Sequence, residues 1–193
     1  MRPSGDRAVL LDCDDPAEAR RWHAALVDVA DVTLGARSVL VRGTPADIRQ
    51  LVGATDPGDV PAATFEDVRI EVAYDGEDLD EVAELTGMTR TEVIAAHTAT
   101  PWDIAFTGFA PGFAYLVGGD PRLQVPRRGL PRPRVPAGTV ALAGAYSGVY
   151  PGESPGGWQL IGRTTATLWD LDRDPPALLR PGGRVWFVEA EAD

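Results

Sequence analysis

Between Phe106 and Thr164 the sequence concentrates glycine, proline, arginine and aromatic residues, the types that build a rigid ligand site. Glycine lets a ligand approach the main chain and proline fixes one backbone angle, so such a segment forms shaped loops rather than helices. The densest stretches are Gly108–Phe113 and Ser154–Trp158. Arginines and aromatic rings held by such loops recognise charged or planar groups. The segment therefore predicts a binding site for a small anionic or planar molecule.

Residues 152–156 match the G-x-S-x-G pattern of serine hydrolases, but the chemistry of that motif does not fit them. The hydrolase turn uses the N–H of the residue after the serine as an oxyanion donor, and it leads into a helix. Pro155 has no N–H, and Gly156 and Gly157 follow it where a helix would begin. Ser154 is therefore predicted to hydrogen-bond a ligand or to cap a turn, and not to act as a nucleophile.

The charges are distributed unevenly along the chain. Residues 121–134 carry arginines without an acidic residue, whereas the stretch from Asp56 to Glu92 is rich in acids. Arg127 and Arg132 lie beside prolines, which would hold their side chains in place for an anion. Alternatively, these arginines solvate the loop or pair with the acidic stretch, because exposed ion pairs are common. The sequence leaves both interpretations open.

Two histidines and one cysteine complete the set of reactive side chains. His97 falls near the end of an expected helix, where it would stabilise the helix end or transfer a proton beside the glycine-rich loops. Tyr150, in a loop before Pro151, has a hydroxyl that could face the ligand. His23 and Cys13 are predicted to be structural, since no catalytic group adjoins either. Their positions show no metal-ligand spacing, so no metal site is expected.

The composition excludes several classes of function. The formal net charge of -11 argues against a nucleic-acid partner, because nucleic acids are bound mainly through Lys and Arg. The sequence contains no lysine, which excludes a lysine-dependent phosphate-binding loop and Schiff-base chemistry. With one cysteine and no long apolar segment, neither a disulfide nor membrane insertion is expected, and the protein is predicted to be cytoplasmic.

The first half alternates strands and helices. Apolar alternation predicts strands over residues 8–11, 31–34, 37–42 and 68–74, and helices are expected over 16–29 and 44–51. This β-α-β-β-α-β order predicts a ferredoxin-like domain. Residues 75–99 are expected to form two short helices that break at Gly87, and Thr89 with Glu92 predicts a capping box.

From residue 103 onward, short strands separated by glycine and proline replace the helices. Strands are expected over residues 103–109, 114–117, 138–143, 158–168 and 184–189. Such a run of short strands predicts a small closed barrel. The fold class is therefore predicted to be α+β, with a ferredoxin-like domain over residues 1–85 and a β-barrel domain carrying the ligand site over residues 86–193.

The motifs of the second half resemble, in order, those of the carboxyltransferase-type family that includes the 5-oxoprolinase B subunit, allophanate hydrolase subunit 1 and the sporulation kinase inhibitor KipI. The resemblance covers nearly the whole chain. Its most specific pieces are His97, Phe106–Leu116, Pro131–Arg132, Val135–Val140, Tyr150–Pro151, Ser154–Trp158 and Gly162–Thr164.

The resemblance implies that the barrel is cyclophilin-like and that the protein has partners. Family members work with a homologous cyclophilin-like protein, of the type of the 5-oxoprolinase C subunit or allophanate hydrolase subunit 2. In 5-oxoprolinase they also work with the A subunit, which is a lactam hydrolase. Together they use ATP, with which Mg²⁺ is expected, to open the 5-oxoproline lactam to glutamate. Phosphorylation of the amide oxygen would make an otherwise poor electrophile attackable, and no intrinsic cofactor is implied.

We therefore expect the B subunit of an ATP-dependent 5-oxoprolinase-type amidohydrolase, active only with partner subunits. The alternatives are a KipI-like histidine kinase inhibitor and a carboxyltransferase component of a urea carboxylase or allophanate system, whose branch Gly144–Tyr150 resembles more closely. The expected catalytic residues are His97, Tyr150 and Ser154. Substrate or nucleotide is expected to contact Gly108, Pro111, Gly112, Arg127, Arg132, Gly156, Gly157 and Arg163.

Overall fold

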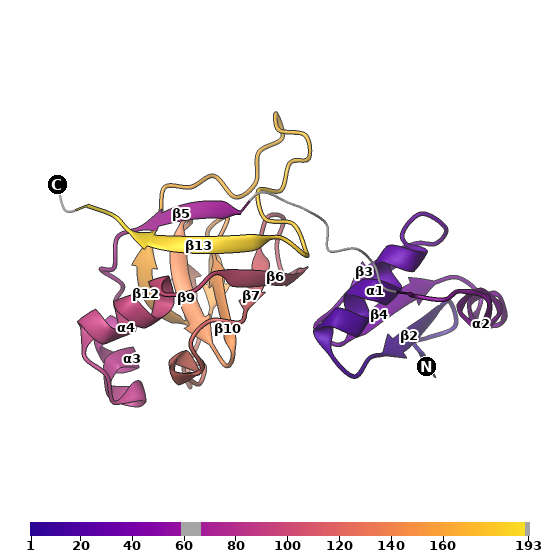
Figure 1. Ribbon diagram of the computed structural model, residues 1–193, viewed down its shortest axis with the longest axis horizontal. Coiled ribbons are helices and arrows are strands. Elements are labelled where there is room, and N and C mark those ends of the chain that lie inside the picture. The colour runs from indigo at the N-terminus through magenta and orange to yellow at the C-terminus, as the bar shows by residue number, and fades with distance from the viewer. Residues whose placement is uncertain (59–66, 192–193) are drawn as a thin grey trace. The chain divides into compact units, whose positions relative to one another are not determined.

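The computed structural model describes residues 1–58 and 67–191 and shows an α+β protein (Figure 1). The chain divides into two compact units, Met1–Thr64 and Phe65–Asp193. This division comes well before residue 85, where the sequence placed the boundary. The reason is that the strand and the helix that follow residue 66 belong to the sheet and core of the second unit.

The first unit is a four-stranded antiparallel sheet with two helices. Its strands lie in the order β1-β2-β4-β3 and are β1 (Arg2–Pro3), β2 (Ala8–Asp12), β3 (Val32–Leu34) and β4 (Ser38–Arg42). Helix α1 (Pro16–Leu26) follows the capping side chain of Asp15, and α2 (Pro45–Ala54) follows that of Thr44. Both helices begin with proline, which suits the first helical position because no N–H is needed there.

The fourth strand of the predicted ferredoxin-like sheet is not found among the described residues of this unit. Residues 68–74 were expected to supply it, but β5 (Val68–Val72) pairs in parallel with β13 (Arg184–Glu189) of the second unit. The short strand β1 lies instead at the edge beside β2. Apolar alternation identifies a half-buried strand without identifying its partner, so the sequence pattern could not separate the two arrangements.

The second unit is a seven-stranded sheet that nearly closes into a barrel. Its strand order is β12-β9-β10-β7-β6-β13-β5. The strands not yet given are β6 (Trp102–Thr107), β7 (Ala114–Val117), β9 (Thr139–Ala143), β10 (Tyr146–Val149) and β12 (Gln159–Arg163). The two edges meet where Ala73 and Arg163 exchange two backbone hydrogen bonds of 2.9 Å. This closure agrees with the expected cyclophilin-like barrel.

Two helices pack together at one side of the barrel (Figure 1), and a small two-stranded ribbon forms a separate sheet. Helix α3 (Leu79–Thr86) packs on β12 and ends at Gly87, whose φ is +67°. Helix α4 (Arg90–Thr98) packs on β13 and begins with the predicted capping box of Thr89 and Glu92. No helix in the described part of the chain has the length and apolar character to cross a bilayer. The remaining elements are the 3-10 helix η1 (Pro121–Leu123) and the ribbon of β8 (Arg132–Val135) and β11 (Ser154–Gly156).

The barrel strands separate two hydrophobic clusters, one on each face of the sheet. Along β9, Val140 and Leu142 belong to the large interior cluster, whereas Ala141 and Ala143 belong to a smaller outer cluster. This division follows from the alternation of side chains along a strand. The other members of the outer cluster are Phe113, Val135, Tyr150, Trp158 and Leu160. The aromatic residues singled out in the sequence therefore gather on the outer face of the barrel.

Candidate functional site

The outer cluster is built from contacting aromatic rings. The Phe113 ring lies 5.1, 5.6 and 5.5 Å, centroid to centroid, from the rings of Tyr115, Tyr150 and Trp158. Gly148 of β10 makes room for it, because a Cβ at that position would lie 3.0 Å from Phe113. The partly exposed members of this group are Phe106, Tyr115 and Tyr146. The cluster therefore presents an accessible aromatic edge.

The loop of residues 108–112 borders this cluster and holds a strained residue. Phe109 has a φ of +70°. Among the described residues, no other residue apart from glycines has a positive φ. Its side chain is nevertheless 61% exposed, with ring contacts to Phe113 and Tyr150 at 5.4 and 6.2 Å. A bulky residue in the left-handed region costs free energy, and such strain concentrates at functional sites. Of the predicted contacts in this loop, Gly108 and Pro111 are exposed and Gly112 is buried.

The β8–β11 ribbon brings several predicted site residues together. Gly156 pairs with Arg132, and a Cβ on Gly156 would overlap the Tyr150 hydroxyl, so only glycine fits there. Ser154 begins the short strand β11 and is followed by no helix. This agrees with the expectation that Ser154 is not a hydrolase nucleophile. The Gly157 carbonyl next to the ribbon accepts the N–H of Arg128 at 2.8 Å.

Arg128 and Arg132 converge on one buried carboxylate. Arg128 Nη1 and Arg132 Nη2 donate to the same Oδ1 of Asp78 at 2.7 and 2.6 Å, and Asp78 is only 2% exposed. Glu81 accepts from Arg128 at 2.9 Å, and Glu77 from Arg132 at 3.3 Å. These two arginines therefore pair with the acidic stretch, as one of the two interpretations of the sequence predicted. The Nη2 group of Arg132 is therefore already engaged with acids, and only the rest of its guanidinium could contact a ligand.

Sequence reasoning missed Asp78. It precedes α3 in the position of an N-cap, but its side chain makes no capping bond. Its Oδ2 accepts the N–H of Leu160 at 2.7 Å, and its own N–H donates to the Leu160 carbonyl at 2.9 Å. One residue thus ties α3, β12 and the ribbon together. The only signal in the sequence was the opposite charge of the arginine-rich stretch 121–134 and the acidic stretch 56–92. This signal does not show which of the many acids pairs with the arginines.

Arg127 is an exposed cation near Tyr150. No ion pair or hydrogen bond of its guanidinium is present within residues 1–58 and 67–191. Burial raises the pKa of the Tyr150 hydroxyl, and the positive charges of Arg127 and Arg132 oppose that shift. The Tyr150 hydroxyl therefore stays protonated at neutral pH and can donate a hydrogen bond. Arg127 is thus open to an anionic group at the outer face, whereas Tyr150 is 2% exposed and packs inside the cluster.

His97 lies in the barrel core, apart from this surface. Its Nδ1 is 2.7 Å from the Tyr74 hydroxyl, and its Nε2 is 2.9 Å from the Ser147 hydroxyl. The ring is fully buried and stacks on Phe187 at 4.4 Å. Burial lowers the pKa of His97 to about 3, so the ring is neutral at physiological pH. Both nitrogens are engaged inside the protein, which places His97 in a structural network and not beside the glycine-rich loops.

Arg163 lies at the seam where the barrel closes. Its Nε pairs with Asp75 at 2.8 Å in an exposed contact, and its backbone closes the barrel with Ala73. Its predicted role as an anion contact therefore has no support from its neighbours. In residues 1–58 and 67–191, no group of His, Cys, Asp and Glu side chains is arranged to hold a metal ion.

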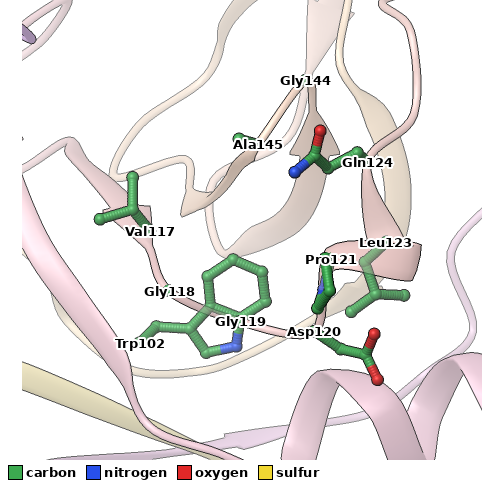
Figure 2. A pocket seen from close by; sticks show the side chains of 10 residues that line it. All are labelled: Trp102, Val117, Gly118, Gly119, Asp120, Pro121, Leu123, Gln124, Gly144 and Ala145. Carbon is green, nitrogen blue, oxygen red and sulfur yellow. The ribbon is translucent and has the colours of Figure 1, made fainter.

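A cavity of about 180 Å³ lies near η1 (Figure 2). It is lined by the Trp102 indole, the residues around Asp120, the Gln124 side chain and the turn at Gly144. Trp102 Nε1 already donates to the His97 carbonyl at 3.0 Å, and Asp120 pairs with Arg122. None of the predicted ligand contacts lines this cavity. The outer aromatic cluster with the ribbon is therefore the candidate functional site.

The nearly closed seven-stranded sheet is consistent with a cyclophilin-like barrel, and the match to a family model gives the class of protein. The family described as carboxyltransferase domain, subdomain C and D, matches residues 1–179, and the chain belongs to this family.

Proteins similar in sequence include bacterial 5-oxoprolinase subunits. The chain is 48% identical over 124 residues to the 5-oxoprolinase B subunit of Bacillus subtilis (strain 168), in a match that covers 63% of this chain and 52% of that protein. It is 36% identical over 202 residues to the 5-oxoprolinase B subunit of Escherichia coli O157:H7, with 95% and 93% of the two chains covered. The match to the Bacillus protein thus spans about half of its length.

Solved structures share the fold. TTHA0988 superposes with a TM-score of 0.85 at 34% identity, over 97% of this chain and 41% of that chain. PH0987 from Pyrococcus horikoshii gives a TM-score of 0.63 at 29% identity, with 98% and 97% covered. The K. lactis urea amidolyase gives 0.77 at 21% identity, over 98% of this chain and 14% of that chain. The last likeness concerns the fold alone.

Proposed function

We propose that this chain is the B subunit of an ATP-dependent 5-oxoprolinase-type amidohydrolase, which opens 5-oxoproline to glutamate only with its partner subunits. The observation that carries the proposal is the 36% identity to a 5-oxoprolinase B subunit over 95% of this chain. The proposed partners are a lactam-hydrolase A subunit together with a homologous cyclophilin-like protein. ATP, with Mg²⁺, is the proposed co-substrate of the complex. A cytoplasmic location is proposed because ATP is available there.

The outer face of the barrel supplies binding groups for this reaction. Arg127 is exposed and offers a planar cation for a carboxylate or phosphate oxygen. Tyr150 is buried beside this face and keeps a protonated hydroxyl, which can donate a hydrogen bond to a group that reaches it. The Ser154 hydroxyl is buried and has no partner in the described part of the chain, so it is available to a ligand. These groups bind and orient, and none is an activated nucleophile, which is why the site is proposed to be completed by a partner.

The test is a glutamate-release assay on the purified chain, alone and with its cognate partners. We expect no turnover by the chain alone, and ATP-dependent turnover of 5-oxoproline when all subunits are present. Robust turnover by the isolated chain would refute a shared site. Absence of turnover by the full set of subunits, each shown to be folded, would refute the amidohydrolase.

A carboxyltransferase component is the second candidate, and the family description favours it. Such a component would accept the carboxyl group from a biotin carrier on another protein, because this chain has no lysine to carry biotin. Transfer of labelled carboxyl from carboxybiotin in the presence of the chain and its partners would support this candidate. A KipI-like role predicts instead that the chain inhibits the autophosphorylation of a histidine kinase.

A further inference from the structure

The ribbon region contains an unusual set of buried polar atoms. In the described part of the chain, four buried side-chain atoms lack a hydrogen-bond partner: Arg128 Nε, Arg132 Nη1, Ser154 Oγ and Gln159 Oε1. All four belong to the ribbon or to the segments directly before β8 and at the start of β12. Burial of a polar group without a partner is costly, so nearly all such groups in folded proteins are paired. Their concentration in one region indicates that something binds there.

Three of these side chains belong to one network. The guanidinium groups of Arg128 and Arg132 lie side by side, because both donate to Asp78 Oδ1. Gln159 joins them through Glu81, whose Oε1 accepts from Gln159 Nε2 at 3.2 Å while its Oε2 accepts from Arg128 at 2.9 Å. Gln159 itself is 1% exposed, so its amide is part of the interior.

Ser154 belongs to the same ribbon. It pairs with Val135 on β8, and Gly156, two positions further along β11, pairs with Arg132. The serine hydroxyl is therefore carried by the strand that pairs with the strand of Arg132.

The free donors of the network favour an oxyanion as the ligand. Asp78 neutralises one of the two guanidinium groups from inside the protein, with a side chain that is 3% exposed. Glu77 and Glu81, the other acids, are 76% and 47% exposed and are screened by solvent. The Arg128 and Arg132 side chains are themselves 30% and 18% exposed, and each also pairs with one of these glutamates. The guanidinium groups also keep free N–H donors, which suit the coplanar oxygens of a planar oxyanion.

Gln159 adds a requirement for a hydrogen-bond donor on the ligand. Its Nε2 donates towards Glu81 and the Pro126 carbonyl, which fixes the orientation of the amide and makes the free atom the oxygen. That oxygen can only accept. Hydrogencarbonate has the matching pattern: one negative charge, planar oxygen acceptors and one O–H. Formate has the same plane and charge without the O–H.

We propose that Arg128, Arg132, Ser154 and Gln159 bind a small planar oxyanion, hydrogencarbonate or a carboxylate. Since the four free atoms are almost fully buried, the ligand consists of only a few heavy atoms. The site shares the ribbon with the proposed function. It is a property of the isolated chain, so its test needs neither partners nor turnover and can fail without affecting the proposed function.

The first experiment titrates the isolated chain with ¹³C-labelled hydrogencarbonate and, separately, with ¹³C-labelled formate, at constant ionic strength adjusted with chloride. Saturable broadening of the ¹³C resonance and a parallel rise in Tm report binding. Tighter binding of hydrogencarbonate identifies it as the ligand, and equal or tighter binding of formate identifies a carboxylate. The site is overturned if neither anion binds saturably, or if a crystal soaked in both shows ordered water only.

Two substitutions place the binding at these residues. Arg132→Lys should weaken oxyanion binding roughly tenfold, since an ammonium cannot replace a bidentate guanidinium. The matched control is Arg134→Lys on the same strand, where the arginine is 74% exposed and pairs with Glu153. The control should leave the Kd within about twofold. Equal effects of the two substitutions would overturn the assignment.

A third substitution tests the site independently, in case the Arg132→Lys protein does not fold. Gln159→Met removes the acceptor while keeping the chain length, so it should abolish any preference for hydrogencarbonate over formate. A preference that survives in a folded Gln159→Met protein would show that the O–H is recognised elsewhere and would contradict the site. Tm and circular dichroism of each variant establish that the protein is folded.

Discussion

At the scale of single residues, Asp78 carries more of the structure than its place in an acidic stretch suggests. It is the shared acceptor of two guanidinium groups and also bonds the backbone of β12. Removal of one partner from such a cluster leaves the other charges buried without compensation. We expect Asp78→Asn to lower the free energy of unfolding by about 2 to 4 kcal/mol, measured by urea denaturation.

The matched control for this prediction is Asp80→Asn. Asp80 is also an acid of the same segment and pairs with Arg90, but both side chains are more than half exposed, at 71% and 51%. The exposed pair should contribute below about 1 kcal/mol. Similar losses in the two variants would show that the buried cluster has no special role.

His97 gives the stability a pH dependence whose sign follows from burial. Its pKa is lowered to about 3 in the folded protein and would be about 6.5 in the unfolded chain. The unfolded state therefore binds the proton first, so the stabilisation present above pH 6.5 is lost as the pH falls towards 3. We expect His97 to account for a loss of about 2 kcal/mol between pH 8 and pH 5. Urea denaturation of wild type and His97→Gln at both pH values measures it, and equal losses in the two proteins would contradict it.

Ser154 tests the chemistry of the ribbon. In the assembled complex, Ser154→Ala should retain measurable 5-oxoproline turnover, because Pro155 cannot supply the N–H that an attacking serine needs for its oxyanion. Loss of a true nucleophile would be close to complete. Abolished turnover in a variant that still assembles, or an acyl group trapped on Ser154, would show that the serine is the nucleophile.

At the scale of elements, the ribbon depends on glycine at one position and not at its neighbour. A Cβ on Gly156 would overlap the Tyr150 hydroxyl, whereas one on Gly152 meets nothing within 4 Å. Gly156→Ala should therefore displace Tyr150 and lower the free energy of unfolding by about 1 to 3 kcal/mol. Gly152→Ala should change it by less than about 1 kcal/mol. The comparison is made by thermal and urea denaturation, and a Gly156→Ala protein as stable as the Gly152→Ala protein would refute the close contact.

The elements also show what the sequence could and could not predict. Local signals worked well: the capping box at Thr89 and the proline-initiated helices lie where they were expected. The pairing of strands that are distant in the sequence produced no comparable local signal. The pattern of β5 is the same for either of two sheets, and its parallel partner β13 lies more than a hundred residues along the chain. For the same reason the sequence indicated the site's glycines and aromatic rings but missed Asp78 and Gln159, whose roles depend on distant partners.

At the scale of the whole chain, the second unit is the part that the resemblance described best. The nearly closed sheet and the outer aromatic cluster put Tyr150, Ser154 and the ribbon glycines on one surface. His97 and Arg163, which the same resemblance marked, lie in the core and at the barrel seam. A family motif records residues that are needed without saying whether they bind a ligand or support the fold. Burial and hydrogen bonding separate these two roles.

The position of β13 between β5 and β6 has a consequence for synthesis on the ribosome. Strand β13 is translated after every other strand of this sheet, yet β5 has no other full-length neighbour in it. Until β13 emerges from the exit tunnel, β5 remains an exposed strand and the barrel stays open between β5 and β6. Open strand edges and apolar faces are prone to aggregation, so nascent chains stalled before residue 184 should require chaperones until translation resumes.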